Sequence, residues 1–226
     1  KIGEGPLGAH KTAKTNESEP TEGPTINSII PLTANSLKVN WNKLSPSVSN
    51  GNITKYEVCY QVGSTVSNCS NNETVFGVDS TMVDLTELEP ATTYAVAVRA
   101  FTKIGEGPLG AHKTAKTNES APGIPRIKQV TSDLTTITLT WDAPLKLNGV
   151  IKRYIVQSLR NDDGSKQIFN ALNLSLKIEN LIPGTNYTLS VSAFTVGEGP
   201  AASVQKRTAK SELDGVEPVF ASVHDD

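Results

Sequence analysis

The sequence predicts an all-β chain of two tandem seven-stranded β-sandwiches, and three observations support this prediction. First, residues 88–102 and 181–195 follow one plan, in which a Leu and a Pro enter a turn, a Tyr follows, and apolar residues then alternate with small or polar ones. An alternation of period two indicates a half-buried β-strand. Second, the two Trp residues, Trp41 and Trp141, each lie on the N-terminal side of one of these strands. Third, many Pro, Gly, Ser, Thr and Asn residues favour short strands joined by turns.

Tyr94 and Tyr187 stand directly after the turn in the two copies. This is the tyrosine-corner pattern of β-sandwiches, in which the hydroxyl group bonds to backbone upstream. Together with Trp41 and Trp141, the pattern resembles the fibronectin type III family, whose modules are immunoglobulin-like sandwiches. The resemblance covers roughly residues 21–210, and it is specific for the fold rather than for a partner.

The predicted organisation has five parts. They are a duplicated last-strand segment of a preceding repeat or a tag (1–20), a first type III domain (21–117), a linker (118–123), a second type III domain (124–210) and a C-terminal tail (211–226). We expect the sequence to be a fragment, because it starts within a repeat and shows no signal peptide.

Alternation predicts the further strands in chain order. In the first domain they are 25–30, 37–41, 53–61 and 81–85, with a polar loop at 45–52 and a last strand after the turn at 105–108. In the second domain they are 126–130, 137–141, a strand entered through 148–154, then 174–178 and 200–208. The inward positions form the predicted core: Trp41, Tyr56, Val58, Leu88, Tyr94, Val96 and Val98 in the first domain, and Trp141, Tyr154, Val156, Leu181, Tyr187, Leu189 and Val191 in the second.

Seven Asn-x-Ser/Thr triplets indicate an extracellular chain, since such triplets accept N-linked glycans in secreted proteins. The asparagines are Asn16, Asn52, Asn68, Asn72, Asn118, Asn173 and Asn186. An Asn-rich chain produces some of these triplets by chance, so an intracellular muscle-type module is the alternative.

The two cysteines, Cys59 and Cys69, point to the same compartment. A hairpin turn near residues 63–65 would place them opposite one another, because both lie five residues from Ser64, and cross-strand pairs are close enough for a disulfide. We predict a surface disulfide that stabilises the hairpin by about 2–3 kcal/mol. Two free thiols are the alternative, and a metal site is disfavoured because two Cys without a nearby His leave zinc short of ligands.

Residues 1–18 recur without change at 103–120. The second copy lies where a type III module has its F–G turn and last strand. The first copy is therefore interpreted as the tail of a preceding near-identical repeat, or as a tag. The alternative is a strand-exchanged homodimer, in which residues 1–18 take the last-strand position of a neighbouring molecule. Exchange within one chain is disfavoured because the connection between the first copy and the first domain would have to run back along the whole module. That connection has about eight residues, which span at most about 28 Å when extended.

No pattern in the sequence predicts catalysis, a cofactor or a metal. The formal net charge is −2 and the isoelectric point about 6.0, so no basic field would attract nucleic acid or anionic lipid. The three Gly-Glu-Gly triplets at 3–5, 105–107 and 197–199 lie in predicted turns with no helix after them, so they offer no phosphate site. No apolar run approaches the roughly 20 residues of a membrane span. We predict a non-enzyme.

The resemblance implies a non-catalytic extracellular segment of a membrane-anchored receptor or adhesion protein, with a protein ligand or cell-surface partner. Receptor-type tyrosine phosphatases and immunoglobulin-superfamily adhesion molecules carry such arrays, and the Ala-Phe-Thr…Gly-Glu-Gly-Pro endings favour the phosphatases. Arg-Gly-Asp is absent from the F–G loop at 102–107. A mechanical spacer and an accessory module of a secreted enzyme are the alternatives. The triplets predict a glycan on the C–F–G face of the second domain and glycans on the C–C′ side of the first. This leaves the A–B–E sheets or the module junction for a protein contact.

Overall fold

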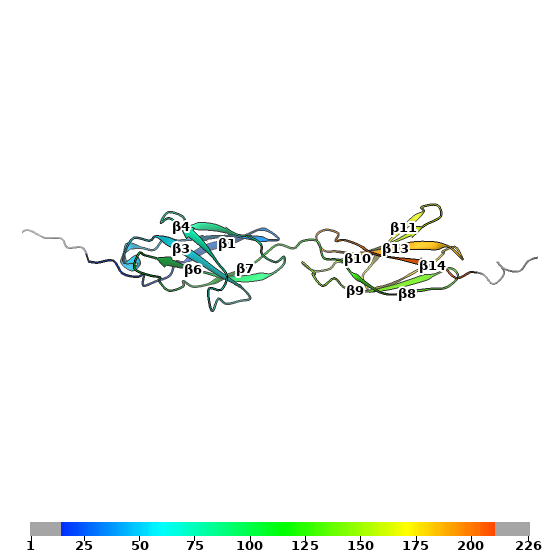
Figure 1. Ribbon diagram of the computed structural model, residues 1–226, viewed down its shortest axis with the longest axis horizontal. Helices are drawn as coiled ribbons and strands as arrows, with labels where there is room; N and C mark the ends of the chain where they lie inside the picture. Colours follow the sequence, from blue (N-terminus) through cyan, green and yellow to red (C-terminus); the bar gives the residue numbers. More distant parts are fainter. Residues whose placement is uncertain (1–14, 211–226) are drawn as a thin grey trace, which may run out of the picture. The chain divides into compact units, whose positions relative to one another are not determined.

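A computed structural model describes residues 15–210, in which the chain divides into two compact units between Asn118 and Glu119. Each unit is a sandwich of a three-stranded and a four-stranded sheet, and all strand pairs are antiparallel (Figure 1). The all-β prediction with two seven-stranded sandwiches is confirmed. No helix within residues 15–210 is long and apolar enough to cross a membrane.

The first unit is built from seven strands and one short helix. Its three-stranded sheet has the order β1 (Ile26–Thr33), β2 (Ser36–Trp41), β5 (Met82–Leu85), and its four-stranded sheet has the order β4 (Asn72–Phe76), β3 (Lys55–Val62), β6 (Thr93–Phe101), β7 (Lys113–Lys116). The helix is α1 (Pro46–Ser49), within a segment predicted as a polar loop. Pro46 suits a first helical turn, and Asn50 ends the helix in the left-handed conformation (φ 51°).

The second unit repeats the plan without the helix. Its three-stranded sheet has the order β12 (Ser175–Ile178), β9 (Ile137–Asp142), β8 (Arg126–Ser132), and its four-stranded sheet has the order β11 (Lys166–Ala171), β10 (Arg153–Arg160), β13 (Asn186–Phe194), β14 (Ala202–Arg207). The strands predicted with both ends are found in both units, and those ends are displaced by up to three residues. The last strand of the first unit begins only at Lys113, beyond the turn at 105–108, and no range was predicted for β4 or β11.

The core of each unit lies between its two sheets, and all fourteen predicted core residues are buried. Trp41 meets Tyr56 edge to face with ring centroids 5.4 Å apart, and Trp141 meets Tyr154 at the same separation. Edge-to-face packing of this kind is favoured by the aromatic quadrupole. The predicted tyrosine corner is present in the second unit, where the backbone N–H of Ile182 donates a 2.9 Å hydrogen bond to the Tyr187 hydroxyl.

Strand β6 departs from the expected pattern of burial. Residues 95 and 97, predicted to face outward, are as buried as their inward neighbours. Both are alanines on a central strand, so their short side chains are covered by flanking residues such as Gln61 and Cys59, their partners on β3. Two predicted segments, the tail 211–226 and most of the duplicated segment 1–20, lie outside the described residues.

Candidate functional site

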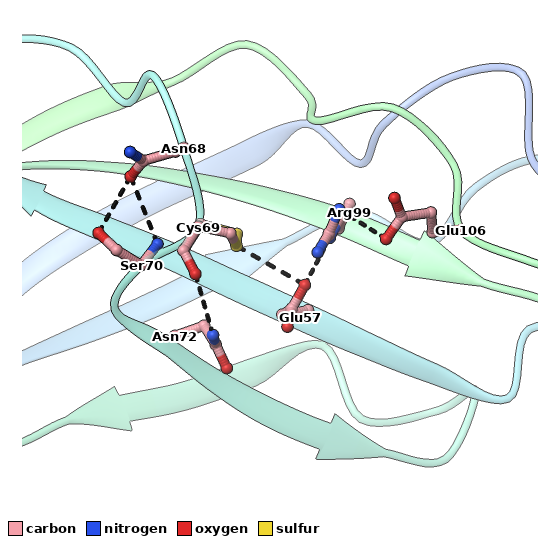
Figure 2. Close-up of a disulfide and its surroundings, with 8 residues drawn as sticks. Glu57, Asn68, Cys69, Ser70, Asn72, Arg99 and Glu106 are labelled. Carbon is pink, nitrogen blue, oxygen red and sulfur yellow. Dashed lines mark hydrogen bonds and ion pairs between the residues drawn. A yellow bond between two sulfur atoms is a disulfide. The ribbon is translucent and has the colours of Figure 1, made fainter.

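The disulfide of the first module joins Cys59, in the middle of β3, to Cys69 in the loop before β4 (Figure 2). Their Cα atoms are 4.9 Å apart. The predicted geometry differs in two respects. Cys59 pairs across the ladder with Asn72 rather than Cys69, because the loop holds more residues than a tight hairpin. Cys59 is also fully buried, so the bond ties the loop to the interior of the sheet rather than stapling its surface.

A charged cluster lies beside the disulfide on the same face of the sheet (Figure 2). The Arg99 guanidinium pairs with Glu57 through Nε, and its Nη1 atom lies 2.7 Å from the Glu106 carboxylate. The Cys69 sulfur lies 3.6 Å from the Glu57 carboxylate. The guanidinium also stands 5.3 Å from the centre of the Phe101 ring, within cation–π range. Sequence reasoning missed this cluster, and its one signal was an Arg within an otherwise apolar strand.

The second module keeps the aromatic part of this arrangement and loses the ionic part. Arg153 stacks on Phe194 with its guanidinium carbon 3.9 Å from the ring centre, as Lys55 stacks on Phe101 at 4.2 Å. At the place of Arg99, Ser192 donates a 2.6 Å hydrogen bond to Glu198. The two outer faces therefore differ in charge, and a ligand of one face need not bind the other.

Within residues 15–210 one group of three metal-ligand side chains comes together, namely Glu57, Cys59 and Cys69. The two sulfurs are bonded to one another, so the group offers one carboxylate, and Arg99 already pairs with it. A single paired carboxylate is a poor metal site.

The seven triplet asparagines are all exposed. Asn72 and Asn186 lie at the starts of β4 and β13, and the register places both on the outer face of their four-stranded sheets. Asn16 and Asn52 line one groove at the start of the first module. Exposure is what a glycan acceptor requires, so glycosylation at all seven positions stays our prediction.

The residues that precede each module, here called the lead-in segments (15–19 and 117–121), dock on the loop that joins β2 to β3 in the first module and β9 to β10 in the second, the B–C loop. In the first, Ser18 donates its backbone N–H to Asn50 O at 2.9 Å, and the Asn50 amide donates to Glu19 O at 3.0 Å. The Thr102 hydroxyl of the F–G turn completes the contact with a 3.0 Å bond to Ser18 O. The sequence predicts only a polar loop at 45–52, but the side chain of Asn50 within that loop also binds the incoming chain.

The second module repeats this docking bond for bond. Ser120 donates to Asn148 O at 2.9 Å, the Asn148 amide donates to Ala121 O at 2.8 Å, and the Thr195 hydroxyl donates to Ser120 O at 2.5 Å. The tetrapeptide Thr-Asn-Glu-Ser thus serves as a lead-in at 15–18 and again at 117–120.

This repetition bears on the duplicated segment. Residues 15–18 lie on the B–C loop of the first module, and the last-strand position beside β6 is held by the module's own β7. That residues 1–20 are the last strand of a preceding repeat or a tag stays a prediction. Strand exchange through residues 1–18 stays the alternative prediction, because residues 1–14 lie outside the described part.

Paired antiparallel sheets, a Trp-centred core and a tyrosine corner define a tandem β-sandwich protein. The fibronectin type III domain family matches residues 19–115 and 120–207. The chain therefore belongs to the fibronectin type III family, as the resemblance implied. Its modules are non-catalytic domains, so membership indicates no enzymatic activity for this segment.

Three relatives illustrate where such modules occur. The chain is 29% identical over 209 residues to protein sidekick-1 of Homo sapiens, covering 88% of this chain and 9% of that protein. It is 31% identical over 228 residues to the cell adhesion molecule DSCAML1 of Gallus gallus, covering 95% and 11%. It is 30% identical over 224 residues to receptor-type tyrosine-protein phosphatase F of Danio rerio, covering 90% and 12%. The chain spans about a tenth of these relatives, and it is an extracellular ectodomain segment of this class.

Proposed function

We propose that the chain is a recognition segment in the ectodomain of a membrane-anchored adhesion protein or receptor, and that the outer face of the β1–β2–β5 sheet contacts a protein ligand. The observation that carries the proposal is that this face combines exposed apolar side chains with strands free of glycan triplets. Protein contacts favour apolar centres with a polar surround.

The apolar centre consists of Ile30 and Met82, which are 47% and 51% exposed. The register places both on the outward side, Ile30 opposite Lys38 and Met82 opposite Asn40. Between them Lys38 lies 3.8 Å from Asp84, an exposed pair that contributes little to stability and is free to reorient toward a partner.

The other sheet faces are less suited to a protein contact. The four-stranded sheets carry Asn72 in the first module and Asn186 in the second, and a glycan there would cover them. The β8–β9–β12 face presents a row of polar side chains, and Asn173 lies next to its edge. Its outward residues are Gln129, Thr131, Thr138, Thr140, Ser175 and Lys177.

Two variants that each add one glycan to a sheet face, here called glycan wedges, test the proposal. Lys38→Asn with Asn40→Thr creates an acceptor triplet on β2, and Thr138→Asn creates one at the equivalent position of β9. The glycosylated chain, made tetravalent, is screened against cells that each display one cell-surface ectodomain. We expect the first wedge to abolish binding and the second to leave it unchanged. Binding that survives the β2 wedge would place the contact elsewhere.

Two alternatives make different forecasts in the same screen. A mechanical spacer binds no displayed ectodomain, with or without the wedges, and an accessory module of a secreted enzyme binds only an enzyme domain of its own parent chain. The strand-exchanged homodimer is tested separately by light scattering. A dimer that becomes a monomer on removal of residues 1–18 supports exchange, and a monomer in both cases refutes it.

A further inference from the structure

One glycan triplet contains a disulfide cysteine as its middle residue. Asn68-Cys69-Ser70 is an acceptor triplet, and Cys69 is bonded to Cys59. None of the other six triplets contains a cysteine. The covalent state of Cys69 therefore decides how freely this triplet can move.

In the oxidised protein Asn68 and Ser70 are bonded to one another, and Cys69 is bonded to the rest of the hairpin (Figure 2). The Asn68 side-chain oxygen accepts hydrogen bonds from the Ser70 hydroxyl at 3.0 Å and from the Ser70 backbone N–H at 3.4 Å. The carbonyl of Cys69 accepts a 3.2 Å bond from the Asn72 amide. The Cys69 side chain is anchored to Cys59, which is fully buried in the sheet.

We infer that Asn68 is glycosylated only while Cys69 is a free thiol, and that closure of the disulfide shuts the site. A transferase must seat the Asn and the hydroxyl of the triplet together in its own groove. With the bond closed, the loop that carries the triplet cannot move away from the sheet without pulling Cys59 out of it, and the Ser70 hydroxyl is already bonded to Asn68. The inference rests on the proposed glycosylation of this chain and is independent of its ligand.

Two reactions compete at this segment, namely glycosyl transfer to Asn68 and formation of the disulfide. In glycosyl transfer, the Asn68 side-chain nitrogen bonds to C1 of a lipid-linked oligosaccharide diphosphate and loses one proton, and the C1–O bond breaks to release the lipid diphosphate. In disulfide formation, the two thiols reduce the disulfide of an oxidoreductase to two thiols and form the Cys59–Cys69 bond.

The order of the two reactions decides the outcome. Asn68 is exposed, so a glycan attached first leaves Cys69 able to reach Cys59. A bond closed first excludes the glycan. The two cysteines are separated by 10 residues, so both emerge within about a second or two of synthesis at roughly 5–20 residues per second. Disulfide formation takes seconds to hours, which leaves a limited interval for transfer.

The test is site-resolved glycopeptide mass spectrometry of the whole chain secreted from mammalian cells. Cys59→Ala removes the bond and leaves the triplet itself unaltered. We expect Asn68 to be occupied in a minority of wild-type chains and in a majority of Cys59→Ala chains. Asn72, in the same hairpin, and Asn173, in the other module, should change little. Adding a dithiol reductant to cells that make the wild-type chain should raise the glycan occupancy of Asn68 selectively. This experiment replaces the variant if the variant is not secreted.

Four results would overturn the inference. Full occupancy of Asn68 in oxidised wild-type chains would do so, as would equal occupancy in wild type and variant. A parallel rise at Asn72 would show that slower folding, rather than the freed cysteine, exposes the triplets. Empty positions at all seven asparagines would refute the glycosylation on which it rests, and that result is distinguishable because the control positions are empty too.

Discussion

A backbone hydrogen bond joins Ser18 to Asn50 where the chain enters the first module. The backbone N–H of Ser18 donates to Asn50 O at 2.9 Å, and the Asn50 amide donates to the residue after Ser18 at 3.0 Å. Asn50 adopts a positive φ of 51°, and its counterpart Asn148 a φ of 52°. Asn tolerates this left-handed region better than most residues, so one residue supplies both the backbone shape and the amide.

Substitution of Asn148 should separate these two contributions. Asn148→Gly keeps the positive φ and removes the amide bond to Ala121 O, so we expect the second module to lose about 1 kcal/mol of unfolding free energy. Asn148→Ala adds the strain of a left-handed Cβ and should cost roughly 1–2 kcal/mol more. Urea unfolding of the whole chain measures both, with the first module as the internal reference. Equal losses would mean that backbone strain is unimportant here.

Opening the disulfide should destabilise the first module selectively. A bond across a sequence separation of 10 stabilises by about 2–3 kcal/mol through the entropy of the unfolded chain. A Cys59→Ala, Cys69→Ala double variant should therefore lower the melting temperature of the first module and leave the second, which has no cysteine, unchanged. Differential scanning calorimetry resolves the two transitions. An unchanged first transition would show that the ladder alone fixes the loop.

The charged cluster should show strong coupling between its members. The Glu57 side chain is only 12% exposed, so Arg99→Met leaves a carboxylate mostly removed from water without its partner. We expect a loss of about 1–3 kcal/mol from this unpaired group. Adding Glu57→Gln to Arg99→Met should recover part of the loss, because the charge is gone. A double variant no better than Arg99→Met in urea unfolding would argue that the stacking of Arg99 on Phe101 matters more than the ion pair.

Tyr56 should make the first module sensitive to alkaline pH. Burial raises the pKa of Tyr56 above its ordinary value of 10.0, and the negative charge of Asp79 raises it further. The Tyr56 hydroxyl therefore loses its proton at a lower pH in the unfolded chain than in the folded one. The free energy of unfolding consequently falls as the pH rises above 10.0. Tyr56→Phe should remove this part of the alkaline loss.

The same substitution should also act at neutral pH. The Tyr56 hydroxyl is buried without a hydrogen-bond partner among the described residues, so Tyr56→Phe should stabilise by about 1 kcal/mol. Tyr154→Phe is the matched control in the second module. Burial raises the pKa of Tyr154 too, but its hydroxyl is not among the buried groups without a hydrogen-bond partner. Tyr154→Phe should therefore reduce the loss of stability at alkaline pH and leave stability at neutral pH unchanged. Thermal unfolding between neutral pH and pH 11 checks both variants.

The fold was largely predictable because burial imposes a period of two on each strand. Strands β2 and β9 alternate cleanly, and their Trp residues mark the core. The alternation failed on β6, where Ala95 and Ala97 are short enough to be covered by their neighbours. Periodicity reports side-chain character, and it cannot report what lies over a small side chain.

The candidate site was less predictable. The pairing of Cys59 with Cys69 followed from their spacing, but the burial of Cys59 depends on the strands that flank it. The Glu57–Arg99–Glu106 cluster joins positions up to 49 apart in sequence (106 − 57), and no local pattern links them. The docking of Ser18 on Asn50 was not predicted either. The corresponding sequence feature is a repeated tetrapeptide, which shows no apolar periodicity.

The docked lead-in segments determine where a fragment of this chain can be cut. A second module expressed from residue 124 would lack Ser120 and Ala121, and its Asn148 amide would lose its acceptor. It would also lack Pro122, which is buried against the module. Expression from residue 117 keeps these contacts and the acceptor asparagine at 118. The second folding unit is therefore a sandwich together with the few residues that precede it.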